Sequence, residues 1–169
     1  MSETLCAQCH DIDPVASETG FILAKIEKTK NICGLCENYA QANADKPVAV
    51  MCCDGACLRG EVARRAANIL CHQLAPEKTV RICLGGAFTK NTGQRGLVGK
   101  ARRLIAMEGC FVDCASRMMR GVIDELRPEI IRVDCLYECD RSLFGVNEMD
   151  DAQITLHART VAESIAKTL

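Results

Sequence analysis

Four short apolar segments alternate with amphipathic segments from residue 48 onward, and this alternation limits the possible folds more than any other feature of the sequence. Continuous apolar runs of this length are typical of parallel strands that are buried on both faces. They occupy residues 48–53, 79–86, 103–109 and 129–135. Segments with helical character follow in residues 58–74, 96–102, 112–126 and 151–168. Because alternating strands and helices imply right-handed crossovers, we expect an α/β fold with an open, mainly parallel four-stranded sheet and flanking helices.

The first 45 residues have a different, polar and irregular texture. Two short helices are expected there, one within residues 17–30 and one over residues 34–45, and the second ends before Pro47. Two CxxC pairs flank the first of these helices: Cys6/Cys9 and Cys33/Cys36. We therefore expect a small cysteine-rich helical N-terminal segment (1–45) followed by an α/β domain (46–169).

Charge and hydropathy exclude several classes of function. The 21 basic residues balance 22 acidic ones, and no basic block or aromatic platform is present, so nucleic-acid binding is not expected. The opening stretch "MSETLCAQCH" lacks the basic-then-apolar order of a signal peptide. No apolar run approaches the roughly 18 residues of a membrane span. We expect a cytoplasmic protein with no membrane partner.

The 13 cysteines are unusual for such a protein. A reducing compartment does not favour a disulfide framework, and an odd number of cysteines cannot pair completely within one chain. Cysteines in this setting indicate metal binding or redox chemistry. Some thiols also serve as small apolar core residues: Cys71 is expected to be one, and for Cys52 the core and site interpretations are evenly balanced.

Many of the cysteines lie at or just after the ends of the predicted strands. Because the carboxyl ends of parallel strands meet at one edge of a sheet, these thiols are expected to converge there. They are Cys52, Cys53, Cys57, Cys83, Cys110, Cys114, Cys135 and Cys139. A thiol at the start of a helix lies near unpaired N–H groups, which favour the metal-binding thiolate. Four such thiols could bind a tetrahedral zinc ion or an iron–sulfur cluster, and spacing alone does not separate the two.

The N-terminal CxxC pairs form a second candidate site. Cys6/Cys9 and Cys33/Cys36 are separated by 23 residues, an arrangement that can surround one zinc ion. The stretch "CAQCH" also matches the CxxCH signature of c-type haem attachment. Haem attachment of this kind requires export, so zinc is the better interpretation.

Three ordered motifs, "CDGACLRGEVARRAANIL", "ICLGG" and "IAMEGCFVDCA", carry a resemblance to a known family. From residue 48 to about residue 135 the chain resembles the DGC-domain family, whose members are described as zinc-binding proteins. The resemblance implies four metal-binding cysteines: Cys53, Cys83, Cys110 and Cys114. Glu108 stands where the family has aspartate and keeps the acid, a change that should matter little. Cys57, Cys135 and Cys139 lie outside the family pattern and are possible additional ligands.

Two classes of function follow from these features. One is a zinc-binding protein whose metal is structural or is carried to a partner protein. The other is an iron–sulfur or thiol-dependent enzyme that handles sulfur or redox chemistry on a small thiol or sulfur-containing ligand. The excess of cysteines favours the enzyme, whereas the lack of an acid–base set or a cofactor loop favours zinc binding. We expect a four-cysteine zinc site at the carboxyl edge of the sheet.

Overall fold

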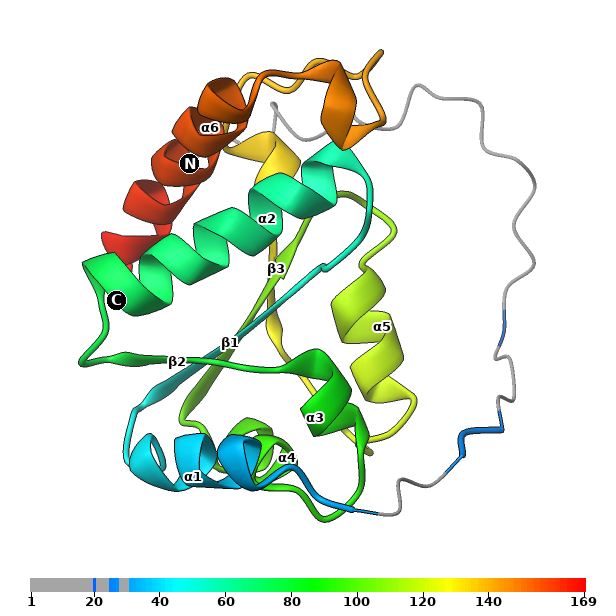
Figure 1. Cartoon of the computed structure of the whole chain (residues 1–169), viewed down its shortest axis with the longest axis vertical. Helices are drawn as coiled ribbons and strands as arrows, with labels where there is room; N and C mark the ends of the chain where they lie inside the picture. The colour runs from blue at the N-terminus through cyan, green and yellow to red at the C-terminus, as the bar shows by residue number, and fades with distance from the viewer. Residues whose placement is uncertain (1–19, 21–24, 28–30) are drawn as a thin grey trace.

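The computed structural model describes Gly20, residues 25–27 and residues 31–169 of the chain (Figure 1). Its centre is a four-stranded sheet in the order β2-β1-β3-β4, and every neighbouring pair is parallel. The strands are β1 (Val48–Cys52), β2 (Thr79–Arg81), β3 (Arg103–Glu108) and β4 (Glu129–Arg132). The α/β fold with flanking helices is therefore confirmed, and its sheet is parallel throughout.

Helices cover both faces of the sheet (Figure 1). They are α1 (Gly34–Ala42), α2 (Leu58–Ile69), α3 (Leu84–Phe88), α4 (Gly93–Lys100), α5 (Cys114–Arg120) and α6 (Asp151–Ala166). Three shorter turns complete the fold: η3 (Leu70–Leu74), a π-helical extension of α2, and the 3-10 turns η4 (Val133–Cys135) and η5 (Val146–Glu148). None of the helices in the described part of the chain has the length and apolar character needed to cross a membrane.

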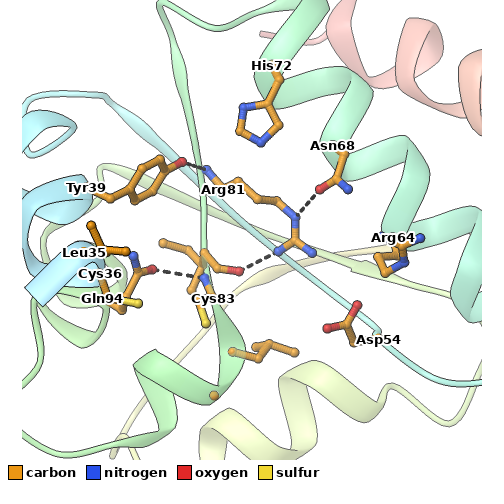
Figure 2. A pocket seen from close by; sticks show the side chains of 13 residues that line it. Leu35, Cys36, Tyr39, Asp54, Arg64, Asn68, His72, Arg81, Cys83 and Gln94 are labelled. Carbon is orange, nitrogen blue, oxygen red and sulfur yellow. Dashed lines mark hydrogen bonds between the residues drawn. The ribbon is translucent and has the colours of Figure 1, made fainter. Parts of the chain in front are cut away.

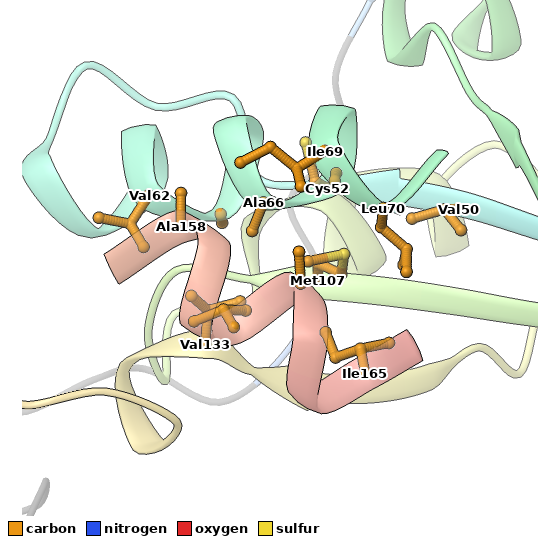
Figure 3. Packing of buried hydrophobic residues seen from close by; sticks show 14 of the residues in the cluster. Val50, Cys52, Val62, Ala66, Ile69, Leu70, Met107, Val133, Ala158 and Ile165 are labelled. Carbon is orange, nitrogen blue, oxygen red and sulfur yellow. The ribbon is translucent and has the colours of Figure 1, made fainter. Parts of the chain in front are cut away.

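Side chains of β1 and β3 alternate between two cores because successive residues of a strand point to opposite faces. On one face, Val50 and Met107 pack under α2 and α6, where Val62 and Ala158 are fully buried (Figure 3). On the other face, Met51 packs with residues of α1, α4 and α5. Each large apolar side chain buried in this way contributes about 1.5–3 kcal/mol.

The order of the strands places a topological switch point between the ends of β1 and β3. The chain leaves β1 through α2 to reach β2, whereas it leaves β3 through α5 to reach β4 on the other side of the sheet. The connections that follow the neighbouring strands β1 and β3 therefore run in opposite directions along the sheet. Open α/β sheets usually bind their ligands at such a point. Cys53 directly follows β1, and Cys110 lies two residues beyond β3.

Several elements differ in their bounds from the sequence-based prediction. The fourth strand ends at Arg132, with residues 133–135 in η4, and the helix expected over residues 96–102 is α4 (Gly93–Lys100). The second strand ends at Arg81, and the expected strand residues 84–86 belong to α3. The Cys83 amide donates to Gln94 Oε1 (3.0 Å), and Cys83 Sγ accepts from Gly86 N (3.4 Å), so the backbone turns into a helix. Helix α5 stops at Arg120, well short of the predicted residue 126, because Gly121 is a poor helix former.

Helix α1 confirms the predicted helix over residues 34–45 and packs on the sheet domain. Ala40 is buried in the second core, and the Glu37 carboxylate accepts from Gly93 N at the start of α4 (2.8 and 2.9 Å). The predicted helix over residues 17–30 lies mostly outside the described residues, and residues 25–27 are not helical. The division of the chain at residue 46 stays a prediction.

Candidate functional site

Four thiols lie at the switch point between β1 and β3, and we call them the switch-point thiols: Cys53, Cys57, Cys110 and Cys114. Cys114 begins α5, and its thiol is near enough to Cys53 and Cys110 for charge on either of them to raise its pKa. Cys57 precedes α2, where its Sγ accepts from Gly60 N (3.4 Å). Three of the four predicted family cysteines thus adjoin one another in space.

Glycines allow the chain segments that carry these thiols to approach closely. A Cβ on Gly109 would lie 2.8 Å from both Arg59 C and Gly60 N, so β3 reaches the backbone of α2 only with glycine at this position. A Cβ on Gly60 would in turn lie 3.1 Å from Gly55 N. A Cβ on Gly55 would lie 3.6 Å from the sulfurs of both Cys53 and Cys57, so Gly55 leaves the space between them empty.

Glu108 fixes the start of α5 from the end of β3. Its carboxylate is fully buried and accepts from Ala115 N (3.1 Å) and Ser116 N (2.7 Å). These N–H groups are among those that lack partners within a helix, and a negative charge at a helix start is favourable. The acid of the family motif therefore holds Cys114 in position, a role that the sequence did not reveal.

Burial favours the protonated form of two of the switch-point thiols, Cys110 and Cys114. It raises the pKa of Cys114 to about 11, with smaller contributions from Cys53 and Cys110. The pKa of Cys110 is also raised, first by burial and then by Asp134 and Cys57. The expected preference for thiolate at the start of α5 is thus outweighed by burial. A bound dication would supply the missing positive charge and displace the protons.

Cys83 lies in a different group, beside a cavity of ≈ 460 Å³ (Figure 2). Cys36, from α1, lines the same cavity as Cys83, and its thiol is near enough to Cys33 and Cys83 for both to raise its pKa. We call Cys36 and Cys83 the cavity thiols, because both line this space. The backbone N–H of Cys36 and its thiol lower the pKa of the exposed Cys33, whereas the neighbouring Cys33 raises the pKa of Cys36.

Arg81 crosses the cavity opposite the cavity thiols (Figure 2). Its Nε donates to Asn68 Oδ1 (3.2 Å), its Nη2 donates to Cys52 Sγ (2.7 Å), and its Nη1 donates to the carbonyl of Ile82. No carboxylate of the described residues lies within ion-pair distance of this guanidinium. Arg81 therefore presents a fixed positive charge to the cavity.

The remaining predicted cysteines fall in several places. Cys52 and Cys71 are buried in the core, and burial raises the pKa of Cys52 to about 12. Cys135 ends η4, with its Sγ 3.7 Å from Asp134 Oδ1, and Cys139 is half-buried in the loop that follows. Cys6 and Cys9 lie outside the described residues.

The predicted convergence of thiols on one metal is only partly visible in these contacts. Within residues 31–169 and the few described before them, no three Cys, His, Asp or Glu side chains are placed to hold a metal ion. The switch-point thiols instead adjoin one another in pairs. Their chemistry suits zinc, since four thiolates form a complete tetrahedral set, and Gly55 leaves room between two of the sulfurs.

Sequence reasoning missed Glu108 and Arg81 as members of the site. Each is a charged residue inside an otherwise apolar strand segment, "RLIAMEG" for Glu108 and "TVRICLGG" for Arg81. A charge that is buried with a strand needs a polar partner, so an acid or base in such a run is a usable signal. Both side chains lie near the carboxyl end of their strand, where the site is.

Comparison with known proteins supports the family resemblance. The family model described as the DGC domain matches residues 49–161, which is more than half of the chain. No curated protein and no solved structure matches the chain. The matched region contains the switch-point thiols and all four strands except for Val48, the first residue of β1. The chain therefore belongs to the DGC domain family.

Proposed function

We propose that the protein binds a zinc ion through the switch-point thiols, between the ends of β1 and β3. The observation that carries this proposal is the nearness of Cys114 to Cys53 and Cys110, which follow the two neighbouring strands β1 and β3. Membership of the DGC domain family supports a metal-binding role. Zinc is preferred because thiolates are its usual ligands in structural sites.

Cys53, Cys110 and Cys114 would supply three ligands, and two residues compete to be the fourth. The family resemblance names Cys83, whereas the contacts favour Cys57, whose sulfur borders the space beside Gly55. When bound, zinc would tie the loop after β1 to the loop after β3. Four thiolates leave no open position on the ion, so the metal would be structural or would be carried to a partner protein.

Zinc content per chain tests the proposal, measured on protein that is purified without oxygen. We expect about one zinc at the switch point, and Cys→Ser changes at positions 53, 110 and 114 should each remove most of it, because serine stays protonated and is a poor zinc donor. The Cys71→Ser variant is the control and should keep its zinc. Iron and acid-labile sulfide in matching amounts would instead establish the iron–sulfur alternative.

The same measurement identifies the fourth ligand. If Cys57 completes the site, Cys57→Ser should lose zinc and Cys83→Ser should keep it. The reverse result would establish the four-cysteine set implied by the family resemblance. A second zinc ion, lost in Cys6→Ser and Cys33→Ser while the switch-point zinc is kept, would support the separate N-terminal site of Cys6, Cys9, Cys33 and Cys36.

A further inference from the structure

The cavity beside Arg81 combines a fixed cation with the two cavity thiols. The guanidinium is half-buried and held by three hydrogen bonds; Asp54 lines the same cavity, but no described carboxylate lies within ion-pair distance of Arg81. Half-burial strengthens its attraction for an anion, because the surroundings screen the charge less than water does. The cavity therefore favours a ligand that carries an anionic group such as a carboxylate.

The opposite wall of the cavity determines what else such a ligand should contain. Figure 2 shows the sulfur of Cys83 and the α1 residues Leu35 and Cys36 on the side of the cavity facing Arg81. Cys83 is exposed, and its Sγ accepts from Gly86 N (3.4 Å). Cys36 is less exposed and lines the same cavity.

We propose that this cavity binds a small disulfide that carries a carboxylate, and that the cavity thiols reduce it by thiol–disulfide exchange. The carboxylate lies against Arg81, and the disulfide faces Cys83. This activity goes beyond the proposed metal site and does not require it, because the switch-point thiols take no part. It assigns Cys83 to the cavity and not to zinc.

The exchange is balanced without any further reactant. Cys83, after losing its proton, attacks one ligand sulfur, so the ligand S–S bond breaks and its other half leaves as a thiolate that takes up a proton. Cys36 then attacks the Cys83 sulfur of this mixed disulfide and displaces the second half of the ligand as a thiol. The two protein thiols are oxidised to a Cys36–Cys83 disulfide, and the ligand disulfide is reduced to two thiols.

The test treats the reduced full-length protein with oxidised glutathione, a disulfide that carries carboxylates, and maps the products by mass spectrometry. In the unmodified protein we expect a Cys36–Cys83 disulfide and two glutathione molecules released per chain. The Cys36→Ser variant should stop at glutathione attached to Cys83. Cys33→Ser should react like the unmodified protein, and Cys71→Ala is the matched control for loss of a thiol outside the cavity.

The role of Arg81 is tested by comparing two disulfides in the same variant. Arg81→Met should slow the reaction with oxidised glutathione about tenfold, because a charge-assisted contact is lost. The reaction with uncharged bis(2-hydroxyethyl) disulfide should change less than twofold. This ratio within one variant separates ligand binding from any general loosening of the fold, and Arg81→Lys should restore part of the preference.

Three results would overturn the proposal. One is a Cys33–Cys36 disulfide with Cys83 unmodified. The second is an equal loss of rate for both disulfides in Arg81→Met. The third is loss of zinc in Cys36→Ser or Cys83→Ser, which would make that thiol a metal ligand. Loss of zinc in Cys53→Ser or Cys114→Ser concerns the metal site alone, so the two proposals fail separately.

Discussion

The switch-point thiols and the cavity thiols lie along the same edge of one sheet, but the fold holds them in different ways. The first group is carried on segments that pack backbone to backbone through Gly55, Gly60 and Gly109. The cavity thiols come from α1 and from the start of α3, and they border open space. Packing at the switch point favours a fixed, closed metal site, whereas the cavity favours exchange with a ligand from solution.

The two groups also differ in their relation to the family. The family match begins at residue 49, so it includes the switch-point thiols and Cys83 but not Cys36 on α1. The cavity therefore forms where a helix outside the matched region packs on the family domain. The number of cysteines at the carboxyl edge of the sheet therefore says little about function until the surroundings of each thiol are known.

The largest expected effect tests the close packing at the switch point. In Gly109→Val the new side chain would meet the α2 backbone, 2.8 Å from Arg59 C, which side-chain rotation cannot relieve. We expect the free energy of unfolding to fall by on the order of 4 kcal/mol, with loss of switch-point zinc. Urea unfolding measures this. The control is Gly96→Ala in α4, where no atom lies within 4 Å of the added Cβ, so stability should be equal or slightly higher.

The next effect compares Cys114 with the exposed Cys33, which precedes α1, by their protonation. With a pKa of about 11 against 9.0 for an ordinary thiol, Cys114 in the metal-free protein should be alkylated about a hundredfold more slowly than an ordinary thiol at pH 8. Cys33, whose pKa is lowered, should react first, as mass spectrometry of iodoacetamide-treated protein would detect. Equal rates at Cys114 and Cys33 would contradict the opposite pKa shifts of these two thiols.

The same raised pKa has a consequence for stability. Because the folded protein holds the Cys114 proton more tightly than the unfolded chain does, the stabilisation is fully present below pH 9 and is lost as pH rises towards 11. Metal-free protein should therefore unfold more readily as the solution is made alkaline through this range. Zinc-loaded protein should show less of this dependence.

The smallest expected effect concerns the Glu37 contact that attaches α1, and with it Cys36, to α4. Glu37→Ala removes the carboxylate that caps α4 at Gly93, which should cost about 1 kcal/mol. The attachment of α1 is weakened, so alkylation of Cys36 should become a few-fold faster while switch-point zinc stays unchanged. Glu27→Ala, at an exposed position outside α1, serves as the control. A loss of zinc in Glu37→Ala would mean that the two groups of thiols are coupled.

The sheet and the edge that carries the thiols were predictable, because buried parallel strands leave a clear apolar pattern and their carboxyl ends must meet. The partner of Cys83 was not predictable. It depends on where α1 packs, and that is decided by the Glu37 contact with Gly93, which joins residues 56 positions apart. The role of Glu108 was hidden for a similar reason, since its carboxylate reaches α5 only after Gly109 has turned the chain.

Tyr39 on α1 has a consequence for how the chain behaves in crowded solution. Strand β2 is an edge strand of the sheet. The amide of Ile82 donates to Val50 O of β1 (2.8 Å), and since successive amides of a strand point in opposite directions, the Arg81 amide points away from β1. The Tyr39 hydroxyl accepts this outward N–H at 3.2 Å. An unpaired amide on an edge strand can bond to a strand of another molecule. The Tyr39 hydroxyl occupies this amide and so opposes intermolecular strand pairing at this edge. Displacement of α1 would therefore open the cavity and expose a site for intermolecular strand pairing at the same time.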